Sequence, residues 1–287
     1  MHIHVSHETT YRYEQPVRSL VQVLRMTPRG HANQHVRHWR IETSVGEPLR
    51  AREDSLGNIV HVFSADGPLQ TLTLRVVGEV NTGDSSGIVR GTVERVPDLF
   101  YLRQSDLAQA DEAIAAFARE AAGEVVADPL AALHRLLAAL HAEMTFDTGP
   151  TQASTSAAEA FALRRGVCQD ITHIFLACCR HLGVPARYIS GYFHRDDGVV
   201  RQEAGHAWAE AKVPGLGWIG FDPTNGFCTT EAHVRVAVGL DYLGAAPIRG
   251  SRAGGGGEAL EVRLLVADSA EYQVQAQGQQ GQWQSQR

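Results

Sequence analysis

The sequence RRGVCQDITHIFLACCRHLGVPARYISGYF, from Arg164 to Phe193, contains three of the four cysteines of this 287-residue chain. A helical pattern extends from about Val167 to Leu182 and ends at Gly183, with a proline two residues beyond. The run ARYISGYF that follows is rich in aromatic residues and predicts a strand. The segment therefore predicts a helix that leads into a sheet, and the roles of its cysteines decide what chemistry the chain can perform.

The composition of the chain changes near Pro97. Before it, β runs such as HVRHWRIET and LQTLTLRVVGEV are separated by the turn sequences TPRGHAN, SVGEP, DSLGN and SADGP, which predicts an antiparallel β-sandwich over residues 1–96. After it, Ala- and Leu-rich helical segments precede further strands, which predicts a core of helices packed on an antiparallel sheet over residues 97–250. Together these patterns predict an α+β fold.

The last segment, residues 251–287, is predicted to hold three features. RAGGGG is expected to be a flexible linker. The run ALEVRLLVA predicts a strand that returns to pair with the N-terminal sheet, because an isolated strand leaves its backbone groups without partners. The Gln-rich end from about Gln273 is expected to be disordered.

Composition excludes several classes of protein. With 26 basic and 32 acidic residues the net charge is −6, which argues against a nucleic-acid-binding protein. No stretch approaches the ~18 consecutive apolar residues of a membrane span. The first residues show no signal-peptide pattern, and four cysteines without an export signal predict a cytoplasmic protein that lacks disulfides. The oligomeric state stays open.

Three of the four cysteines are predicted to be structural. Cys178 and Cys179 lie in the middle of the apolar helical run, where burial raises the pKa of a thiol and leaves it unreactive. Cys228 follows a predicted strand and is interpreted in the same way. No metal-binding spacing of cysteine or histidine is present, so we expect no metal and no cofactor.

Cys168 differs because it stands at the first turn of its helix. Unpaired backbone N–H groups and the positive end of the helix dipole stabilise an anion there, and the thiolate is the reactive form of cysteine. Gly166, just before it, would let a substrate approach the sulfur closely. A thiol nucleophile also needs an imidazole base and an acceptor that orients the imidazole.

Two strands downstream offer those partners. His206 begins the predicted strand HAWAEAKV, and Asp222 ends the next one, GWIGFD. If the two strands pair antiparallel, Asp222 can accept the Nδ1–H of His206. Cys168, His206 and Asp222 are therefore predicted to be nucleophile, base and orienting acid.

Further residues are weaker candidates for the site. The backbone N–H of Cys168 is the first expected oxyanion donor, with the Gln169 side chain as a candidate second donor. Trp208 is predicted either to cover the Cys–His pair or to pack within the sheet. Tyr192 and Asn225 are candidate pocket residues. His173, on the same helix as Cys168, is expected to pack or to support the site.

The motifs RRGVCQDITH, GVPARYISGY and GHAWAEAKVPGLGWIGFDPTNG resemble those of the transglutaminase-like superfamily of papain-like cysteine enzymes. In that family they carry a Cys-His-Asp triad, and the matching positions here are Cys168, His206 and Asp222. The stretches YRYEQPV, LRMTPR and DSLGNIV resemble the N-terminal β region of bacterial members, and VAVGLDYLGAAPIRG resembles the end of the core. The resemblance extends from about Tyr11 to Gly250.

This resemblance implies acyl transfer through a thioester on a peptide or protein substrate. A peptidase or amidase is the expected activity, because nothing in the sequence indicates a dedicated amine site. The alternatives are a protein-glutamine transglutaminase, in which an amine replaces water, and a non-catalytic scaffold. The intact triad argues against the scaffold.

Overall fold

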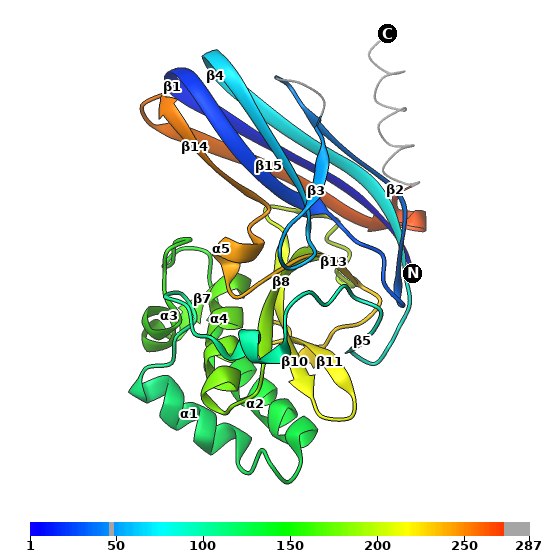
Figure 1. Ribbon diagram of the computed structural model, residues 1–287, viewed down its shortest axis with the longest axis vertical. Coiled ribbons are helices and arrows are strands. Elements are labelled where there is room, and N and C mark those ends of the chain that lie inside the picture. The colour runs from blue at the N-terminus through cyan, green and yellow to red at the C-terminus, as the bar shows by residue number, and fades with distance from the viewer. Residues whose placement is uncertain (46–48, 273–287) are drawn as a thin grey trace.

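The computed structural model describes residues 1–45 and 49–272 (Figure 1). The Gln-rich end and part of the predicted turn SVGEP lie outside the described residues. Two antiparallel sheets dominate the molecule, and a group of helices covers the second sheet on the side away from the first. In Figure 1 the first sheet lies above and the helices lie below.

The first sheet is built on two very long strands, β1 (His2–Thr27) and β4 (Ile59–Thr82), which pair antiparallel along most of their length. Both strands show buried and exposed residues in alternation, as expected when one face of a sheet is covered. The strands that complete this sheet are β2 (Gln34–Thr43), β3 (Ala51–Glu53), β9 (Arg201–Gln202), β14 (Ile248–Gly254) and β15 (Glu258–Asp268).

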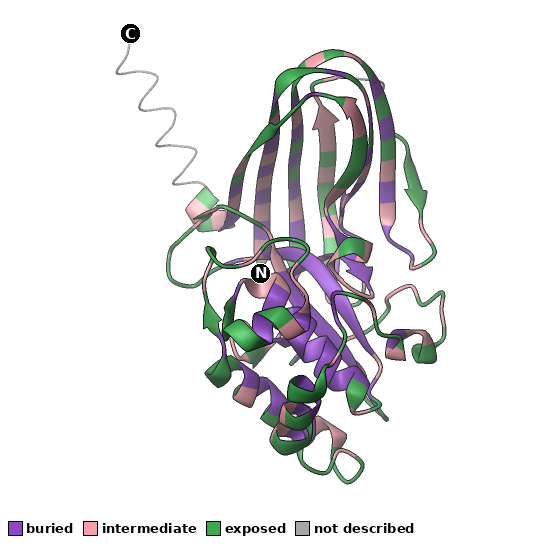
Figure 2. Ribbon diagram, turned by 90° about the vertical axis from the view of Figure 1, so that its left-hand side faces the viewer, coloured by how far each residue is buried: buried purple, intermediate pink, exposed green. Residues whose placement is uncertain are grey.

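The predicted turn at SADGP is wrong, because this sequence lies inside β4. The pairing of β1 with β4 continues on both sides of it, with a register shift between Val17–Leu69 and Ser19–Asp66. Both long strands arch over together at the far end of the sheet (Figure 2). Residues from both halves then share one core, including Leu20, Leu24, Met26, Phe63, Leu72, Leu74 and Val76. The N-terminal region is thus one sheet that bends over on itself.

The end of the described chain returns to this sheet, which confirms the strand predicted in ALEVRLLVA. β15 pairs with β1 from Ile3–Asp268 to Tyr13–Glu258. β14 includes the first half of the predicted linker and also pairs with β1. The glycines between the two strands are fixed in part, since the backbone N–H of Glu14 donates to Gly257.

The helices are α1 (Glu112–Ala122), α2 (Pro129–Glu143), α3 (Ala157–Leu163) and α4 (Cys168–His181), with a 3₁₀ turn η1 (Asp98–Leu102) before them and a short α5 (Tyr242–Ala245) near the end. Their starts follow from capping residues. Ser156, the N-cap of α3, forms a reciprocal capping box with Glu159. α4 is buried all round from Asp170 to Arg180 and is the central helix (Figure 2).

The second sheet has the order β12 (Phe227–Cys228), β11 (Gly217–Asp222), β10 (His206–Val213), β8 (Ala186–Phe193) and β13 (His233–Gly239), and β5 (Ile88–Val89) also pairs with β11. The short strands β6 (Thr145–Phe146) and β7 (Arg165–Gly166) form a separate parallel pair beside it. α4 packs on β10 and β8, where Ala207, Ala209 and Ala211 belong to the same core as the helix. The predicted α+β fold class, with helices on an antiparallel sheet and an antiparallel N-terminal sheet, is confirmed.

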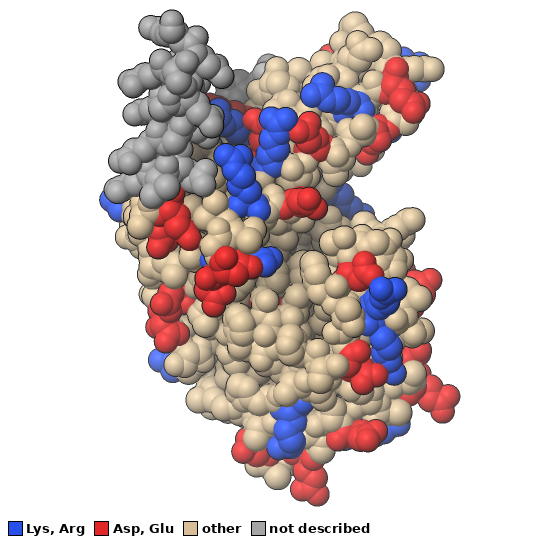
Figure 3. Space-filling model, turned by 180° about the vertical axis from the view of Figure 1, so that it is seen from behind, with Lys and Arg blue, Asp and Glu red and all other residues tan. Residues whose placement is uncertain are grey.

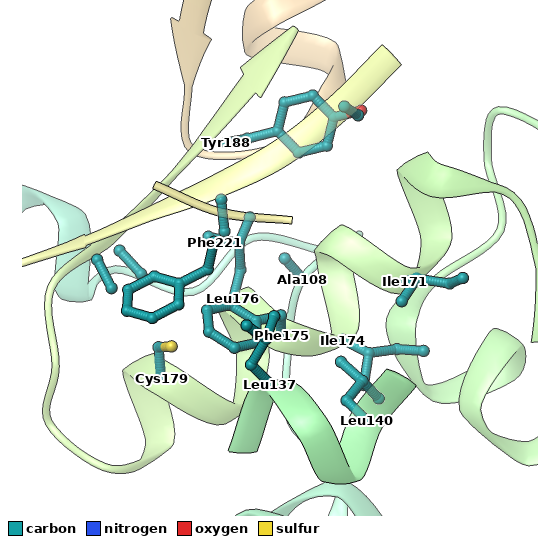
Figure 4. Close-up of a cluster of buried hydrophobic side chains, with 14 of the residues drawn as sticks. Ala108, Leu137, Leu140, Ile171, Ile174, Phe175, Leu176, Cys179, Tyr188 and Phe221 are labelled. Carbon is teal, nitrogen blue, oxygen red and sulfur yellow. The ribbon is translucent and has the colours of Figure 1, made fainter. Parts of the chain in front are cut away.

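The core between α4, α2 and the second sheet contains Cys178 and Cys179. Figure 4 shows the sulfur of Cys179 near Phe175 and Phe221. Cys178 and Cys179 are fully buried, and burial raises the pKa of both thiols well above its usual value. Their predicted packing role is confirmed. Cys228 is half-buried, and burial raises its pKa to about 11.

The back of the molecule carries scattered charges of both signs, with a notch between the bent sheet and the helical part (Figure 3). Among residues 1–45 and 49–272, the structure contains no helix with the length and apolar character needed to cross a bilayer.

Candidate active site

Cys168 is the first residue of α4, and Asp170 fixes the turn around it. One carboxylate oxygen of Asp170 accepts the backbone N–H of Val167 at 2.9 Å and the hydroxyl of Thr151 at 2.7 Å. Burial raises the pKa of Asp170. A Cβ on Gly166 would lie only 2.7 Å from that carboxylate, so the close approach of Asp170 by itself requires a glycine here.

His206 is the first residue of β10 and contacts both other members of the predicted triad. Its Nε2 lies 2.6 Å from Oδ2 of Asp222. The side chain of Cys168 lies close enough to the imidazole to help raise its pKa. The predicted use of Nδ1–H toward Asp222 is wrong. The ring extends from the end of the strand so that its outer nitrogen faces Asp222, which leaves Nδ1 for the thiol.

The electrostatics of this cluster favour a charged imidazole. Burial alone would lower the pKa of His206, but the charge and hydrogen bond of Asp222 and the neighbouring Cys168 raise it to about 10. Burial alone would raise the pKa of Asp222, yet His206 and a second histidine, His233, hold it well below the usual value. The geometry therefore stabilises an imidazolium paired with a carboxylate.

Asp222 is fully buried and receives five donors. Oδ1 accepts the backbone N–H groups of Thr224 and Asn225, both at 3.1 Å, within the turn after β11. Oδ2 accepts from His206, from the Asn225 amide at 2.7 Å and from His233 at 3.1 Å. Asn225, a candidate pocket residue, thus contacts the acid of the triad.

His233 was missed by the sequence analysis. It is the first residue of β13, HVRVAVG, and nothing in that run distinguishes it from any histidine at the start of a strand. It reaches Asp222 because the chain passes from β12 at one edge of the second sheet to β13 at the other edge. Only this long-range connection brings it to the site.

Two of the other candidates make contacts around the histidines and the sheets. Trp208 is buried and packs with Ile189 and Trp218, and its ring centroid lies 6.1 Å from that of His206, so it packs within the sheet and also borders the predicted base. The hydroxyl of Tyr192 hydrogen-bonds Nδ1 of His7 at 3.1 Å, at the contact between the two sheets. Trp208 thus joins the region of the histidines to the core of the second sheet, and Tyr192 joins the second sheet to the first.

Gln169 and His173 lie on the first turns of α4. The amide of Gln169 donates to the backbone oxygen of Ala153 at 3.2 Å, which holds the loop before α3 against the helix. His173 is fully buried, its Nε2 accepts the backbone N–H of Tyr242 at 3.0 Å, and burial lowers its pKa to about 3. His173 therefore has the predicted supporting position rather than that of a base.

Two phenylalanines line the histidines. The ring of Phe193 lies 5.2 Å from that of His206 and 4.7 Å from that of His233, centroid to centroid. Phe227 is 40% exposed and its ring lies 6.2 Å from Phe193. Phe193 and Phe227 thus form an apolar surface beside the two histidines. The sequence analysis identified neither residue.

The ligand-type atoms of His206, Asp222 and His233 lie within 4.8 Å of one another, a spacing that a metal ion could use. However, three hydrogen-bond donors already converge on the same carboxylate oxygen. This is the environment of an anion held by donors rather than that of a metal ligand. The expectation of a metal-free protein stays a prediction.

Comparison with known proteins agrees with the fold. The family model of the transglutaminase-like superfamily matches residues 116–223, and that of the bacterial transglutaminase-like N-terminal region matches residues 3–81. A crystal structure from Cytophaga hutchinsonii, named a "putative cysteine protease", superposes with a TM-score of 0.74 at 20% identity, over 94% of this chain and 91% of that chain. That likeness shows a shared fold.

Relatives of known sequence extend over nearly the whole chain. An uncharacterized protein of Mycobacterium leprae is 31% identical over 272 residues, which is 91% of this chain and 97% of that protein. An uncharacterized protein of Mycobacterium tuberculosis (strain H37Rv) is 29% identical over 272 residues, 86% of each. With both family models matched and the triad motifs in place, the chain belongs to the transglutaminase-like superfamily.

Proposed function

We propose that this protein is a cysteine-dependent acyl-transfer enzyme that hydrolyses peptide or carboxamide bonds. The observation that carries the proposal is one imidazole, that of His206, which is hydrogen-bonded to the Asp222 carboxylate and lies close enough to the thiol of Cys168, at a helix N-terminus, for the thiol to raise its pKa. This is the arrangement of nucleophile, base and orienting acid that thiol acyl transfer requires.

In the proposed reaction, Cys168 transfers its proton to His206 and the thiolate attacks the carbonyl carbon of the substrate. The tetrahedral oxyanion accepts a hydrogen bond from the backbone N–H of Cys168. The C–N bond then breaks as His206 returns the proton to the leaving amine, which leaves a thioester on Cys168. Water, deprotonated by His206, attacks the thioester and releases the acid and the free thiol.

Asp222 supports both half-reactions without exchanging protons. Its hydrogen bond to Nε2 keeps the imidazole in the orientation that leaves Nδ1 for the thiol, and its charge favours the imidazolium that forms in each half-reaction. The exposed edge of Phe227 beside the histidines supports a substrate that presents an apolar group next to the scissile bond.

Hydrolysis is proposed over transamidation because water is present at far higher concentration than any amine. The test is an amide-release assay on casein and on a glutamine-containing peptide, with and without a labelled primary amine. We expect release of ammonia or free amine with little incorporated label. Label incorporation that equals amide release would identify a transglutaminase instead.

Two variants make the assay specific. Cys168→Ala should abolish release, whereas Cys178→Ala, a matched change in the buried part of the same helix, should keep it in the fraction that folds. Release that survives in the Cys168→Ala variant would exclude the proposed mechanism. A folded wild-type protein with no release and no preferential reaction at Cys168 would indicate the scaffold alternative.

A further inference from the structure

We infer that His233 is a positioning residue of this enzyme, a fixed neutral donor that holds Asp222 toward His206. The inference rests on the proposed function. Nε2 of His233 lies 3.1 Å from the same Oδ2 that receives His206. The His233 side chain is 2% exposed and that of Asp222 is 0% exposed. Two imidazoles thus meet one carboxylate oxygen away from water.

The proton on His233 is located by its second contact. The backbone N–H of Thr230 lies 3.1 Å from Nδ1 of His233. A backbone N–H can only donate, so Nδ1 must offer its lone pair. The neutral ring then carries its proton on Nε2 and donates it to Asp222. Burial also lowers the pKa of His233, in agreement with a neutral ring.

The same contacts exclude His233 from acting as a base. Its only lone pair is occupied by Thr230, and its only N–H is directed at Asp222. His206 differs, because its Nε2 donates to Asp222 while Nδ1 stays available to the thiol. The two histidines therefore have separate roles, one that exchanges protons and one that does not.

Aromatic rings hold the His233 ring in place. Trp208 meets it edge to face at 5.1 Å between ring centroids, Phe193 lies at 4.7 Å and Phe227 at 6.1 Å. None of these neighbours carries a charge. The titratable groups that face His233 are Asp222 on β11 and His206 on β10.

The N-terminal sheet fixes the turn that carries His233. This turn closes by a hydrogen bond from the His233 backbone N–H to Thr230 at 3.2 Å. The hydroxyl of Thr82, at the end of β4, donates to the backbone oxygen of Glu231. The amide of Gln34 on β2 makes two hydrogen bonds of 2.8 Å with the backbone of Arg235. The first sheet thus holds the start of β13 through side chains.

The expected effect on catalysis has two parts. Without the His233 donor, Oδ2 of Asp222 is held by fewer hydrogen bonds and orients the His206 ring less firmly, so turnover falls. The negative charge of Asp222 is then stabilised by fewer hydrogen bonds, so it attracts the proton of the His206 imidazolium more strongly. The pH at which His206 loses its proton should therefore rise. A residue that only packs would change neither the pH profile nor the protonation of His206.

Three substitutions separate these roles. His233→Phe keeps the ring but removes the donor. His233→Gln can still place an amide N–H near Asp222, whereas the shorter His233→Asn can accept from Thr230 but not reach Asp222. We expect kcat to fall about 10- to 100-fold in the Phe and Asn variants, the range that one hydrogen bond to a charged group represents. The His233→Gln variant should keep most of the wild-type kcat, and KM should be nearly unchanged in all three variants.

The readout that does not need a substrate is the rate at which iodoacetamide alkylates Cys168, measured from pH 5 to 11. In the His233→Phe and His233→Asn variants, the part of the rate–pH curve in which His206 loses its proton (the His206 limb) should move to higher pH. In the His233→Gln variant this limb should lie near its wild-type pH. If the Phe variant does not fold, the Asn and Gln variants decide the question. If both His233→Phe and His233→Asn show the wild-type dependence of alkylation rate on pH, the inference is overturned. Lower activity together with an unchanged His206 limb would overturn it as well.

Nuclear magnetic resonance of the imidazole nitrogens gives a second check. We expect His233 as the Nε2–H tautomer across the neutral pH range, and the Nδ1–H tautomer would overturn the inference. Neither this measurement nor the alkylation profile depends on turnover. A wild-type protein with the expected tautomer and limb but no amide release would contradict the proposed function alone.

Discussion

The guanidinium of Arg187 lies 2.6 Å from the carboxylate of Glu210, and neither side chain is more than 1% exposed. Glu210 also accepts from Arg235 at 2.8 Å. Burial alone would raise the pKa of Glu210, but the two arginines lower it to about 2. Glu210 is on β10, the strand that begins with His206, so this buried pair belongs to the strand that carries the predicted base.

Glu210→Gln should destabilise the protein by about 3–5 kcal/mol, because it leaves Arg235 without its carboxylate and the buried Arg187 with only the partly exposed Glu94 as counter-charge. The measurement is urea unfolding followed by tryptophan fluorescence. Glu42→Gln is the control, since the Arg40–Glu42 pair is exposed and should contribute only ~0–1 kcal/mol. Equal effects of the two substitutions would contradict the buried pair.

The free energy of unfolding should depend on pH through His206 and Asp222. The folded pKa of His206 is about 10 against a reference of 6.5, so its contribution is complete below pH 6.5 and is lost as the pH rises toward 10. The pKa of Asp222 is lowered from 3.8, so its contribution is present above pH 3.8 and is lost as the pH falls further.

The difference in stability between the wild type and Asp222→Asn should therefore be largest between pH 4 and 6.5 and should shrink toward pH 10, as these pKa shifts require. Urea unfolding at several pH values measures it. Asp222→Asn should also reduce amide release without abolishing it. A stability difference that grows from pH 7 to 10 would show that His206 is not the partner.

Cys168 should be alkylated by iodoacetamide at neutral pH far faster than the other three cysteines. Cys178 and Cys179 are fully buried, and a pKa of about 11 leaves only about one Cys228 side chain in ten thousand as thiolate at pH 7. Peptide mass spectrometry over time measures each site. The control is the same reaction in urea, where all four should react. Preferential labelling of Cys228 in the folded protein would remove Cys168 as nucleophile.

The returning strand β15 should contribute to the stability of the whole fold. Leu264 is 3% exposed and belongs to the main core, whereas Leu260 on the same strand is 57% exposed. Leu264→Ala should cost about 2–5 kcal/mol, and Leu260→Ala should cost less than ~0.5 kcal/mol. Thermal or urea unfolding compares them. Similar small effects would mean that β15 does not pack in solution as it does in the structure.

Local patterns in the sequence were enough to predict the four longer helices and most strands, and to single out the residues of the proposed triad. The start of α3 at Ser156 follows from a capping box, and α4 ends where a glycine and a proline stop it. Cys168 stands out because a helix N-terminus is a property of the local chain. His206 and Asp222 stand out because they end two consecutive strands that pair.

Only the tertiary structure decided how these residues act together. The choice of Nε2 over Nδ1 in His206, the bend shared by β1 and β4, and the approach of His233 to Asp222 depend on contacts between distant segments. A sequence specifies such contacts through the packing of the whole chain, so no short stretch contains them. The residues of the proposed triad are visible in the sequence, but the hydrogen bonds among His206, Asp222 and His233 form only when the strands of the second sheet are assembled.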